Sequence, residues 1–362
     1  MSTVAVLGAG AGGLSAAAEL SGAGHRVRLW NRNPATLDRN VHNGRIRYTG
    51  ILGTGEVWPD LVTTDLADAI SSADVVVVCL PGLAHHALFT DLAAARPEVP
   101  VVLNPGHTGG ALHLRAVFTE HNVPLPPVAE FSTLTYVARV PDGTVRVSGR
   151  AARLWVACLP NGKAALDAGT ELFTGAQAAP DVLFSSLANV NLVLHPPGAM
   201  LGLSWVEATG GTFTFYVEGM TPGVARVIEA LDAERRAVAA AFGHRVPDLI
   251  TEMAAIGTAN PEAARTGQTM AAIRGGVANQ KISAPDSLQH RYYAEDLPFG
   301  LLPFVVLAGI AKIPVPVASA LLTLGTAATG TDPESMGLTA IRLGLAGLGI
   351  AEVLNLVREK EN

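Results

Sequence analysis

The chain has 362 residues, of which 49% are hydrophobic and 15% charged, and its formal net charge at pH 7 is −6. This length exceeds what one compact core usually holds, so we expect two domains. The Lys and Arg residues form no basic stripe, which argues against nucleic acid as a partner. Cys79 and Cys158 each lie in an apolar run, which predicts buried thiols in a reducing cytoplasm.

Two apolar segments resemble membrane or export signals. The N-terminus is apolar but lacks the basic region of a signal peptide, so we expect a cytoplasmic protein. The stretch from Leu301 to Ala328 is interrupted by Pro303, Lys312, Pro314 and Pro316. A spanning helix needs about 20 predominantly apolar residues, so this stretch predicts two packed helices and no membrane partner.

The start of the chain has the pattern of a dinucleotide-binding turn. The apolar run Val4–Leu7 enters GAGAGG and leaves it as an alanine-rich helix. In this GxGxxG spacing Gly8 permits the tight turn, Gly10 lets the backbone approach a pyrophosphate, and Gly13 lets the helix pack on its strand. The free N–H groups at the start of that helix favour a phosphate anion.

Alternating strands and helices continue to about residue 182. The β-rich runs predict a doubly wound α/β Rossmann domain over residues 1–182, in which the later strands form a sheet extension with hairpin character. Gly143 and Pro141-Asp142 supply the hairpin turn. The predicted strands are 4–7, 26–30, 75–80, 101–103, 128–130, 133–140, 144–149 and 154–158.

The remainder, residues 183–362, is predicted to be an all-helical domain. Val224, Ile228, Leu231 and Arg235 share one face of a helix, and the wet side is expected to carry Asp232, Glu234 and Arg236. The closing segment, residues 338–360, is predicted to be one helix that ends in a charged tail.

The residues after the second strand bear on the choice of cofactor. NAD-binding turns usually have Asp or Glu there to bond the ribose 2′-OH, but this chain reads Trp30-Asn31-Arg32-Asn33. Arg32 would attract a 2′-phosphate, which favours NADPH over NADH. In the alternative interpretation Arg32 is an ordinary exposed cation and Asn31 bonds the 2′-OH.

Two polar blocks in the helical half are candidates for chemistry. Asn191 and His195 share one helix face, and the following Pro196-Pro197 are expected to disturb that helix. The block Arg291-Tyr-Tyr-Ala-Glu-Asp296 combines a cation with two tyrosines and two carboxylates. Simpler interpretations remain: His195 as a satisfied core histidine, and the second block as helix caps and salt bridges. We expect His290 to be solvated and leave the role of His107 open.

Five motifs in the same order resemble the opine dehydrogenase family, the octopine and nopaline dehydrogenase type. The resemblance is strongest to the branch of N-(1-D-carboxylethyl)-L-norvaline dehydrogenase. The motifs are GAGAGG at 8–13, NPGHTGGAL at 104–112, NVNLVLHP at 189–196, FYVEGMTP at 215–222 and RYYAEDLPFGL at 291–301.

This resemblance implies NAD(P)H-dependent reductive condensation of the amine of an amino acid with a 2-oxo acid, by imine reduction. It places the catalytic histidine at His195, its partner at Asp296 and a substrate-carboxylate ligand at Arg291. His107 stands where the family usually has a small residue, which puts the polarity of that loop in doubt. The further substrate-binding residues that we predict are Asn191, Tyr216 and Thr108. The predicted cofactor-binding residues are Gly8, Gly10, Ala11, Gly12, Gly13, Asn31, Arg32, Pro81 and Asn104.

Two alternatives stay open at this point. One is a reductase of the ketopantoate reductase or 3-hydroxyacid dehydrogenase type, although those enzymes usually carry a lysine on the helix where this chain has His195. The other is a non-catalytic dinucleotide sensor. No Cys cluster or HExxH motif indicates a metal, and apolar faces of the second domain could support a homodimer.

Overall fold

The computed structural model describes residues 1–359 and divides into two compact units. Unit 1 comprises Met1–Gly106, Leu114–Val182 and the short segment that begins at Arg358. Unit 2 comprises His107–His113 and Leu183–Val357. The loop that begins at His107 is therefore part of the helical unit, although it follows a strand of unit 1 in the chain.

Unit 1 is built on an eight-stranded sheet in the order β12-β11-β8-β7-β6-β1-β2-β5. All neighbouring strands are parallel except β8 and β11. The strands are β1 (Thr3–Leu7), β2 (Arg26–Trp30), β5 (Leu61–Thr63), β6 (Val75–Val78), β7 (Val101–Leu103), β8 (Val128–Phe131), β11 (Leu154–Cys158) and β12 (Ala176–Ala178). This arrangement confirms the predicted Rossmann fold class.

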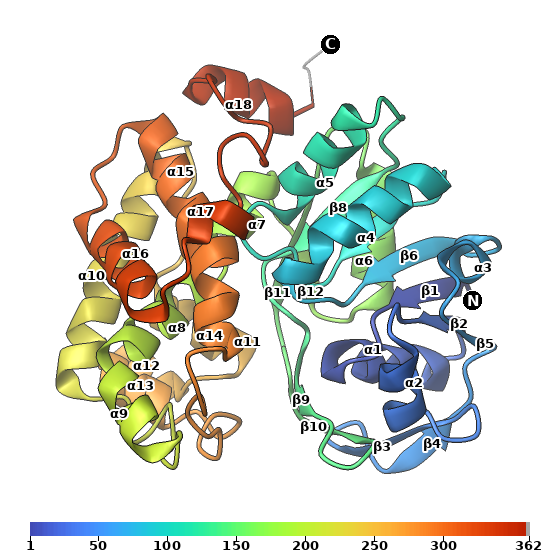
Figure 1. The fold of residues 1–362 in the computed structure, drawn as a ribbon, viewed down its shortest axis with the longest axis horizontal. Coiled ribbons are helices and arrows are strands. Elements are labelled where there is room, and N and C mark those ends of the chain that lie inside the picture. The colour runs from blue at the N-terminus through green and yellow to red at the C-terminus, as the bar shows by residue number, and fades with distance from the viewer. Residues whose placement is uncertain (360–362) are drawn as a thin grey trace. The chain divides into compact units, whose positions relative to one another are not determined.

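Helices cover this sheet and bury its central strands. They are α1 (Ala11–Gly22), α2 (Pro34–Asn40), α3 (Leu66–Ile70), α4 (Gly82–Ala95), α5 (Gly110–Glu120) and α6 (Lys163–Leu172). In Figure 1, α4 and α5 are drawn in front of β8. β6 and β7 are buried along their whole length, as expected for parallel strands that are covered on both faces.

A second, four-stranded sheet in unit 1 corrects the predicted sheet extension. Its order is β4-β3-β10-β9, from β3 (Ile46–Gly50), β4 (Gly55–Val57), β9 (Tyr136–Arg139) and β10 (Thr144–Arg150). The hairpin β9–β10 turns through Gly143 at φ 75°, as predicted, but β10 pairs with β3 rather than with the main sheet. That pairing joins strands far apart in the sequence, so local patterns did not reveal it.

The cysteines of unit 1 differ in burial. Cys79 is buried after β6, and this burial raises the pKa of its thiol to about 12. Cys158 at the end of β11 is only half-buried, contrary to the expectation of two buried thiols. Burial again raises the pKa of the Cys158 thiol, and the charge of Glu359 adds to the effect. Neither environment favours a reactive thiolate.

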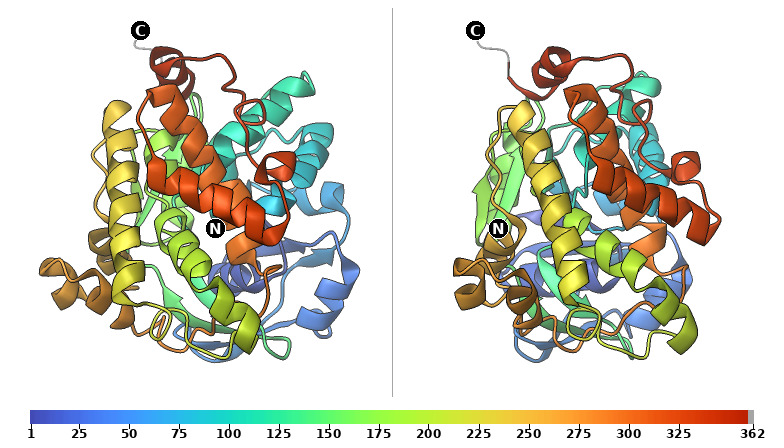
Figure 2. Two further views of the ribbon diagram at one scale, coloured as in Figure 1. Left: turned by 60° about the vertical axis from the view of Figure 1, so that its left-hand side comes forward. Right: turned by 90° about the vertical axis from the view of Figure 1, so that its left-hand side faces the viewer.

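Unit 2 is mainly helical and also confirms its predicted class. Its helices are α7 (Val182–Leu187), α8 (Asn191–Leu201), α9 (Leu203–Thr209), α10 (Pro222–Ala241), α11 (Leu249–Ile256), α12 (Pro261–Arg265), α13 (Thr269–Arg274), α14 (Arg291–Ala294), α15 (Leu302–Ala311), α16 (Pro316–Thr329), α17 (Pro333–Met336) and α18 (Ile350–Val357). A π-helical turn, η1 (Leu297–Leu301), joins α14 to α15. Figure 2 shows α10 as the long yellow helix beside α8.

The apolar stretch Arg291–Ala311 is mostly buried inside the protein. Residues Arg291–Ala311 form one helical stretch of sufficient length and hydropathy to cross a membrane, but 72% of its most apolar window is buried inside the protein. Lys312 then ends α15 in a left-handed conformation, and Pro316 begins α16. The predicted pair of packed helices with a break between them is therefore confirmed.

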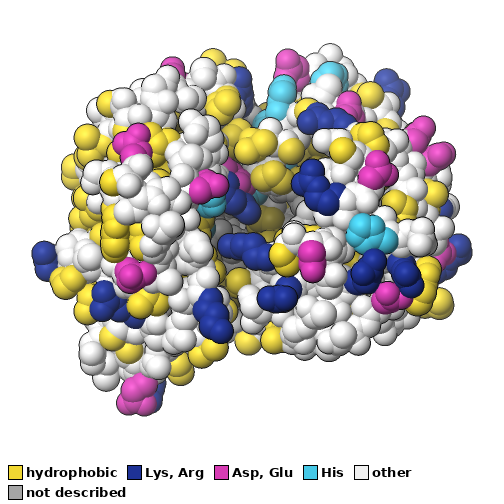
Figure 3. Space-filling model, turned by 60° about the horizontal axis from the view of Figure 1, so that its bottom comes forward, with side chains coloured by type: hydrophobic (Ala, Val, Ile, Leu, Met, Phe, Trp, Pro, Cys, Tyr) yellow, Lys and Arg dark blue, Asp and Glu magenta, His cyan; other side chains and the backbone are white. Residues whose placement is uncertain are grey.

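Figure 3 shows basic and acidic side chains interspersed with apolar ones over the face that it draws.

The closing helix is shorter than predicted. Among residues 338–359, only Ile350–Val357 are helical, and the preceding segment turns at Gly344 and Gly347, which have φ of 66° and 77°. Left-handed glycines interrupt a helix that the apolar spacing alone would extend. The residues from Lys360 onward lie outside the described part of the chain.

An ion pair inside α10 also departs from the sequence pattern. Arg235 lies on the buried face, as expected, but Asp232 is buried too, with exposures of 1% and 6%. Asp232 Oδ1 accepts from Arg235 Nη2 at 2.6 Å, and its Oδ2 accepts from the backbone N–H of Leu249 at 3.1 Å. Arg235 also donates to the carbonyls of Leu187 and Pro247. The pair thus connects α10 to the end of α7, at Leu187, and to the start of α11, at Leu249.

Removing Arg235 should destabilise unit 2 strongly, because Asp232 would remain buried without its cation. We expect Arg235→Ala to lower the free energy of unfolding by about 3 kcal/mol or more, measured by urea denaturation. Arg265 forms a similarly spaced pair with Glu262, but both side chains are more than 70% exposed. Arg265→Ala should therefore change stability by less than about 0.5 kcal/mol. Equal losses in the two variants would contradict the structural role of the buried pair.

Candidate functional site

The site in unit 2 is centred on His195, which projects from the N-terminal half of α8. This helix begins at Asn191 and continues through Pro196 and Pro197 to Leu201, so the predicted disruption does not occur. The two prolines lie in the middle of α8, which stays helical although it lacks the hydrogen bonds that their missing N–H groups would donate. Asn191 and His195 are one turn apart, as predicted, and Asn191 is half-buried.

Asp296 holds one ring nitrogen of His195. The carboxylate Oδ2 lies 2.8 Å from His195 Nδ1, and both residues are 8% exposed. Asp296 immediately precedes the π-helical turn η1, a conformation that is rare and frequent at functional sites. An ionised carboxylate can only accept, so opposite ionised Asp296 the Nδ1 atom carries the proton, and a neutral His195 presents its Nε2 lone pair.

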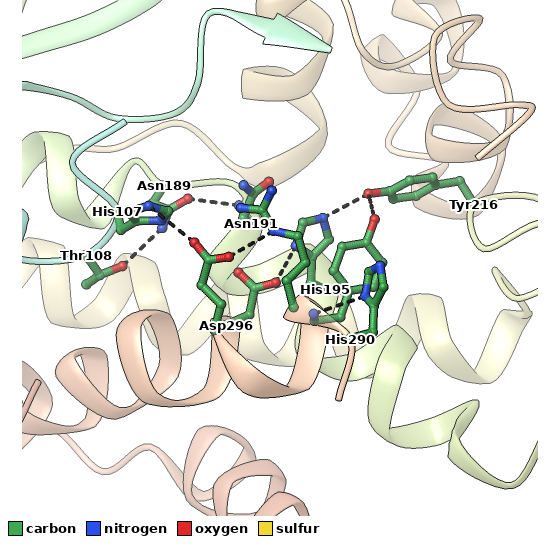
Figure 4. Close-up of polar contacts among 11 residues, drawn as sticks. His107, Thr108, Asn189, Asn191, His195, Tyr216, His290 and Asp296 are labelled. Carbon is green, nitrogen blue, oxygen red and sulfur yellow. Dashed lines mark hydrogen bonds and ion pairs between the residues drawn. The ribbon is translucent and has the colours of Figure 1, made fainter. Parts of the chain in front are cut away.

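Two tyrosines complete the surroundings of His195. Tyr216 Oη lies 2.8 Å from His195 Nε2 and 3.0 Å from Tyr292 Oη. The ring of Tyr292 is stacked on the imidazole, with centroids 4.0 Å apart and planes at 26°. Figure 4 shows His195 between Asp296 on one side and Tyr216 on the other. The contacts of Tyr216 to the imidazole and of Tyr292 to its ring face were not predicted.

A second carboxylate, Glu295, lies beside the first. Its Oε2 is 2.9 Å from Arg291 Nε and its Oε1 is 3.4 Å from His107 Nε2. Glu295 is 1% exposed whereas the Arg291 side chain is 54% exposed. Burial lowers the pKa of Arg291, but the charges of Glu295 and Asp296 outweigh it and raise that pKa overall. Arg291 is thus a fixed, half-exposed cation.

The loop at residues 107–110 is anchored within the same unit. His107 adopts φ 59°, which a non-glycine residue rarely does. Asn189 Nδ2 donates to Thr108 Oγ1 at 3.2 Å, and Ser186 Oγ accepts from the N–H of Gly109 at 2.9 Å. Thr108 is fully buried, so its hydroxyl supports the loop in this structure. Asn189 was in a block singled out from the sequence, but its partner lies too far along the chain to be inferred.

His290 is half-buried, whereas the sequence predicts a solvated side chain. It lies before α14 and its Nδ1 accepts from the N–H of Tyr292 at 3.3 Å, which makes it the N-cap. Burial lowers its pKa, and the charge of Asp286 opposes this shift. The sequence did not predict this capping role of His290. Among residues 1–359, no three His, Cys, Asp or Glu side chains are grouped to hold a metal ion.

The glycine turn of unit 1 has space where a dinucleotide would need it. A Cβ on Gly8 would lie 2.5 Å from the Cys79 carbonyl, and one on Gly13 would lie 1.8 Å from the Gly8 carbonyl. A Cβ on Gly10 would meet nothing within 4 Å. Gly10 precedes α1, whose first turn, including Ala11 and Gly12, has no side-chain cap. The close packing and the open backbone both fit a pyrophosphate at this helix start.

The predicted cofactor residues beyond the glycines lie at the carboxyl ends of neighbouring strands. Asn31 and Arg32 follow β2, Pro81 precedes α4 after β6, and Asn104 follows β7. In a doubly wound sheet this edge binds the ligand. Arg32 is exposed there and Pro81 is half-buried.

Two of these side chains are engaged inside unit 1. Asn31 Oδ1 accepts from the N–H of Ala9 at 3.1 Å, and Asn40, which was not predicted, donates to the Ala9 carbonyl at 2.9 Å. Asn31 therefore fixes the glycine turn, and its Nδ2 donates to the Asn33 carbonyl at 3.0 Å. Asn104 is fully buried, and its amide bonds Thr135 through both atoms, at 2.8 and 3.2 Å.

Comparison with known proteins matches both halves of the chain. A model of the NAD/NADP octopine/nopaline dehydrogenase alpha-helical domain matches residues 178–329, and a ketopantoate reductase model matches residues 4–161. Opine dehydrogenase of Arthrobacter sp. strain 1C is 33% identical over 359 residues, 98% of each chain. Vitopine synthase of Allorhizobium ampelinum is 24% identical over 98% of this chain and 99% of its own length.

Solved structures show the same fold over the whole chain. Octopine dehydrogenase with NADH and L-arginine has a TM-score of 0.77 at 20% identity and covers 100% of both chains. Yersinopine dehydrogenase with NADP⁺ bound has a TM-score of 0.72 at 16% identity, covering 98% of this chain and 97% of that one. With the extent of the Arthrobacter match, these findings show that the chain belongs to the opine dehydrogenase family and is an NAD(P)-dependent dehydrogenase acting on CH–NH bonds.

Proposed function

We propose that this protein uses NADPH to condense the amine of an amino acid with a 2-oxo acid and reduce the resulting imine to an opine. The His195–Asp296 contact at 2.8 Å carries the proposal, because it pairs a proton-exchanging group with a fixed carboxylate. The match to an opine dehydrogenase over 98% of the chain supports the reaction class. Residues 1–182 would hold the dinucleotide, and residues 183–362 would supply the proton chemistry.

The glycine turn would hold the cofactor, which supplies a hydride when bound. Gly10, Ala11 and Gly12 offer backbone N–H groups at the start of α1 to the pyrophosphate. Arg32 is exposed next to the end of β2, with no carboxylate at this position, and would bind a 2′-phosphate. Asn31 and Asn104 would act through the backbone that they fix, and Pro81 would lie beside the nicotinamide.

The residues of unit 2 would bind substrate and exchange its protons. Imine formation requires the amine to lose a proton and the carbinolamine oxygen to gain one, and a histidine suits both transfers near neutral pH. Asp296 would fix the imidazole and stabilise its charged form. Arg291 would bind a carboxylate with its planar guanidinium. Asn191 would contact substrate one turn from His195, and Thr108 would act by supporting its loop.

A substrate screen tests the proposed reaction. A set of amino acids would be offered with pyruvate, glyoxylate or 2-oxoglutarate, each with NADPH and with NADH. We expect cofactor oxidation that requires both organic substrates, and a product whose mass is the sum of the two minus one oxygen. Oxidation with the oxo acid alone would instead indicate a simple ketone reductase, and no oxidation with any pair would contradict the proposal.

The cofactor preference can be tested at Arg32. A charge-assisted contact to the 2′-phosphate should make kcat/KM for NADPH at least about tenfold higher than for NADH. Arg32→Asp should reverse this ratio, whereas the same change at the exposed Arg146 of β10 should leave it unaltered. Equal or better use of NADH by the unaltered protein would contradict the preference.

The proton-exchanging pair can be tested by single and double changes. His195→Ala should lower kcat roughly 10²-fold or more while the affinity for NADPH stays near normal. Asp296→Asn should give a smaller loss, because the imidazole keeps its place but loses control of its tautomer. The double variant should be little worse than His195→Ala, since the two groups act as one unit. Multiplicative losses would mean that they act separately.

Arg291 should affect binding more than turnover. Arg291→Gln removes the charge that faces a substrate carboxylate, so we expect KM for one organic substrate to rise about tenfold or more with little change in kcat. Arg265→Gln, which removes an exposed cation from α12, serves as the control. An unchanged KM for both organic substrates would exclude Arg291 as a carboxylate ligand.

A further inference from the structure

Neither ring nitrogen of His195 is open to a substrate. Nδ1 lies 2.8 Å from Asp296 and Nε2 lies 2.8 Å from the Tyr216 hydroxyl. Because ionised Asp296 only accepts, neutral His195 has an unprotonated Nε2, and Tyr216 must donate to it. Any proton that His195 exchanges through Nε2 in this arrangement therefore passes through the Tyr216 oxygen.

The Tyr216 hydroxyl also forms a hydrogen bond with a second hydroxyl. Tyr292 Oη lies 3.0 Å away, and either oxygen is able to donate to the other. When His195 is neutral, Tyr216 donates to Nε2 and accepts from Tyr292. When His195 is charged, Nε2–H donates to Tyr216, whose own proton can turn to Tyr292. The two hydroxyls thus satisfy both protonation states of the imidazole without any movement of heavy atoms.

The surroundings of Tyr216 and Tyr292 favour proton transfer along these hydrogen bonds. Tyr216, Tyr292 and Phe215 are all buried, and the Phe215 ring packs against both tyrosine rings at centroid distances of 4.9 and 4.7 Å. Tyr292 covers one face of the imidazole. In such an apolar setting hydrogen bonds are stronger and their geometry is better kept than in water. Three separate elements, α8, α14 and the segment before α10, contribute to it.

We propose that Tyr216 is a catalytic residue that exchanges protons with the substrate, in a Tyr216–His195–Asp296 triad whose hydroxyl is oriented by Tyr292. This inference rests on the proposed imine-forming reaction. It places Tyr216 between His195 and the reacting atoms, so that the imidazole acts at one remove from the substrate.

The proton balance of the reaction agrees with this arrangement. First, the ammonium group of the amino acid gives a proton to Tyr216 Oη while the Tyr216 proton passes to Nε2, which leaves a nucleophilic amine and a charged His195. The amine adds to the oxo acid, and a proton moves from nitrogen to oxygen to give the carbinolamine. Tyr216 then protonates the carbinolamine hydroxyl and regains the Nε2 proton. The C–O bond breaks, water leaves, and the nitrogen lone pair forms the iminium ready for hydride.

Three tyrosine-to-phenylalanine variants test the proposal. Tyr216→Phe should lower kcat roughly 10²-fold, with KM for the organic substrates changed little. Tyr292→Phe should give a smaller loss in the same direction. Tyr293→Phe is the matched control, since its hydroxyl is also buried but donates to the Ala199 carbonyl at 2.9 Å. It should lose some stability and keep the kcat of the unaltered protein.

The outcomes separate the candidate roles of Tyr216. A raised KM at unchanged kcat would make it a substrate-binding residue and overturn the relay. A kcat near normal in Tyr216→Phe would mean that His195 reaches the substrate directly. Combining Tyr216→Phe with His195→Ala should cost no more than His195→Ala alone, and a multiplicative loss would equally contradict the triad.

A measurement on the resting protein keeps this test independent of the reaction. In ¹⁵N-histidine spectra the Nε2 resonance of His195, assigned by its loss in His195→Ala, should shift in Tyr216→Phe and stay in place in Tyr293→Phe. An unmoved resonance would show that the hydroxyl does not bond Nε2 in solution and would overturn the relay. If Nε2 shifts but the unaltered protein forms no opine from any pair, the proposed reaction fails while the contact stands.

Discussion

The contact between His195 Nδ1 and Asp296 Oδ2 determines which ring nitrogen of a neutral His195 is left to accept a hydrogen bond from Tyr216. It joins α8 to the residue before η1 at 2.8 Å, with both side chains nearly buried. Once Asp296 accepts from Nδ1, the neutral imidazole has one remaining acceptor, and this acceptor determines the direction of the Tyr216 hydrogen bond. The chemistry assigned to Tyr216 and Tyr292 therefore follows from the position of a single carboxylate oxygen.

The adjacent residues Glu295 and Asp296 direct their charges to different partners. Asp296 faces a histidine that can gain or lose a proton, whereas Glu295 faces the permanent charge of Arg291 and also lies near His107. Residues that adjoin in a helix point in directions about 100° apart, so one short segment supplies two distinct sites. In the proposed function, this geometry would separate proton exchange at His195 from carboxylate binding at Arg291.

In unit 1 the comparable constraint is the shape of the glycine turn. Gly8 and Gly13 have no room for a Cβ, and the two backbone groups of Ala9 are held by Asn31 and Asn40. The turn is thereby fixed on both sides while Gly10 stays open. A preformed turn reduces the entropy lost when a phosphate binds to its N–H groups. Asn31, which follows β2, thus holds the backbone of the glycine turn through Ala9.

The sequence by itself determined the fold class and the glycine turn, because hydrophobic periodicity and glycine spacing are local properties. It also predicted His195, Arg291 and Asp296 as site residues, through the order of motifs that the chain shares with the opine dehydrogenase family. Tertiary structure alone decided which partner each polar group takes. Asp232 is buried because Arg235 and Leu249 meet it there, and Tyr216 reaches Nε2 because α8 and the segment before α10 pack together. It also decided that β10 pairs with β3. The physical reason is that a hydrogen bond requires two atoms to be positioned to within a few tenths of an ångström, and no local pattern encodes this for residues far apart in the chain.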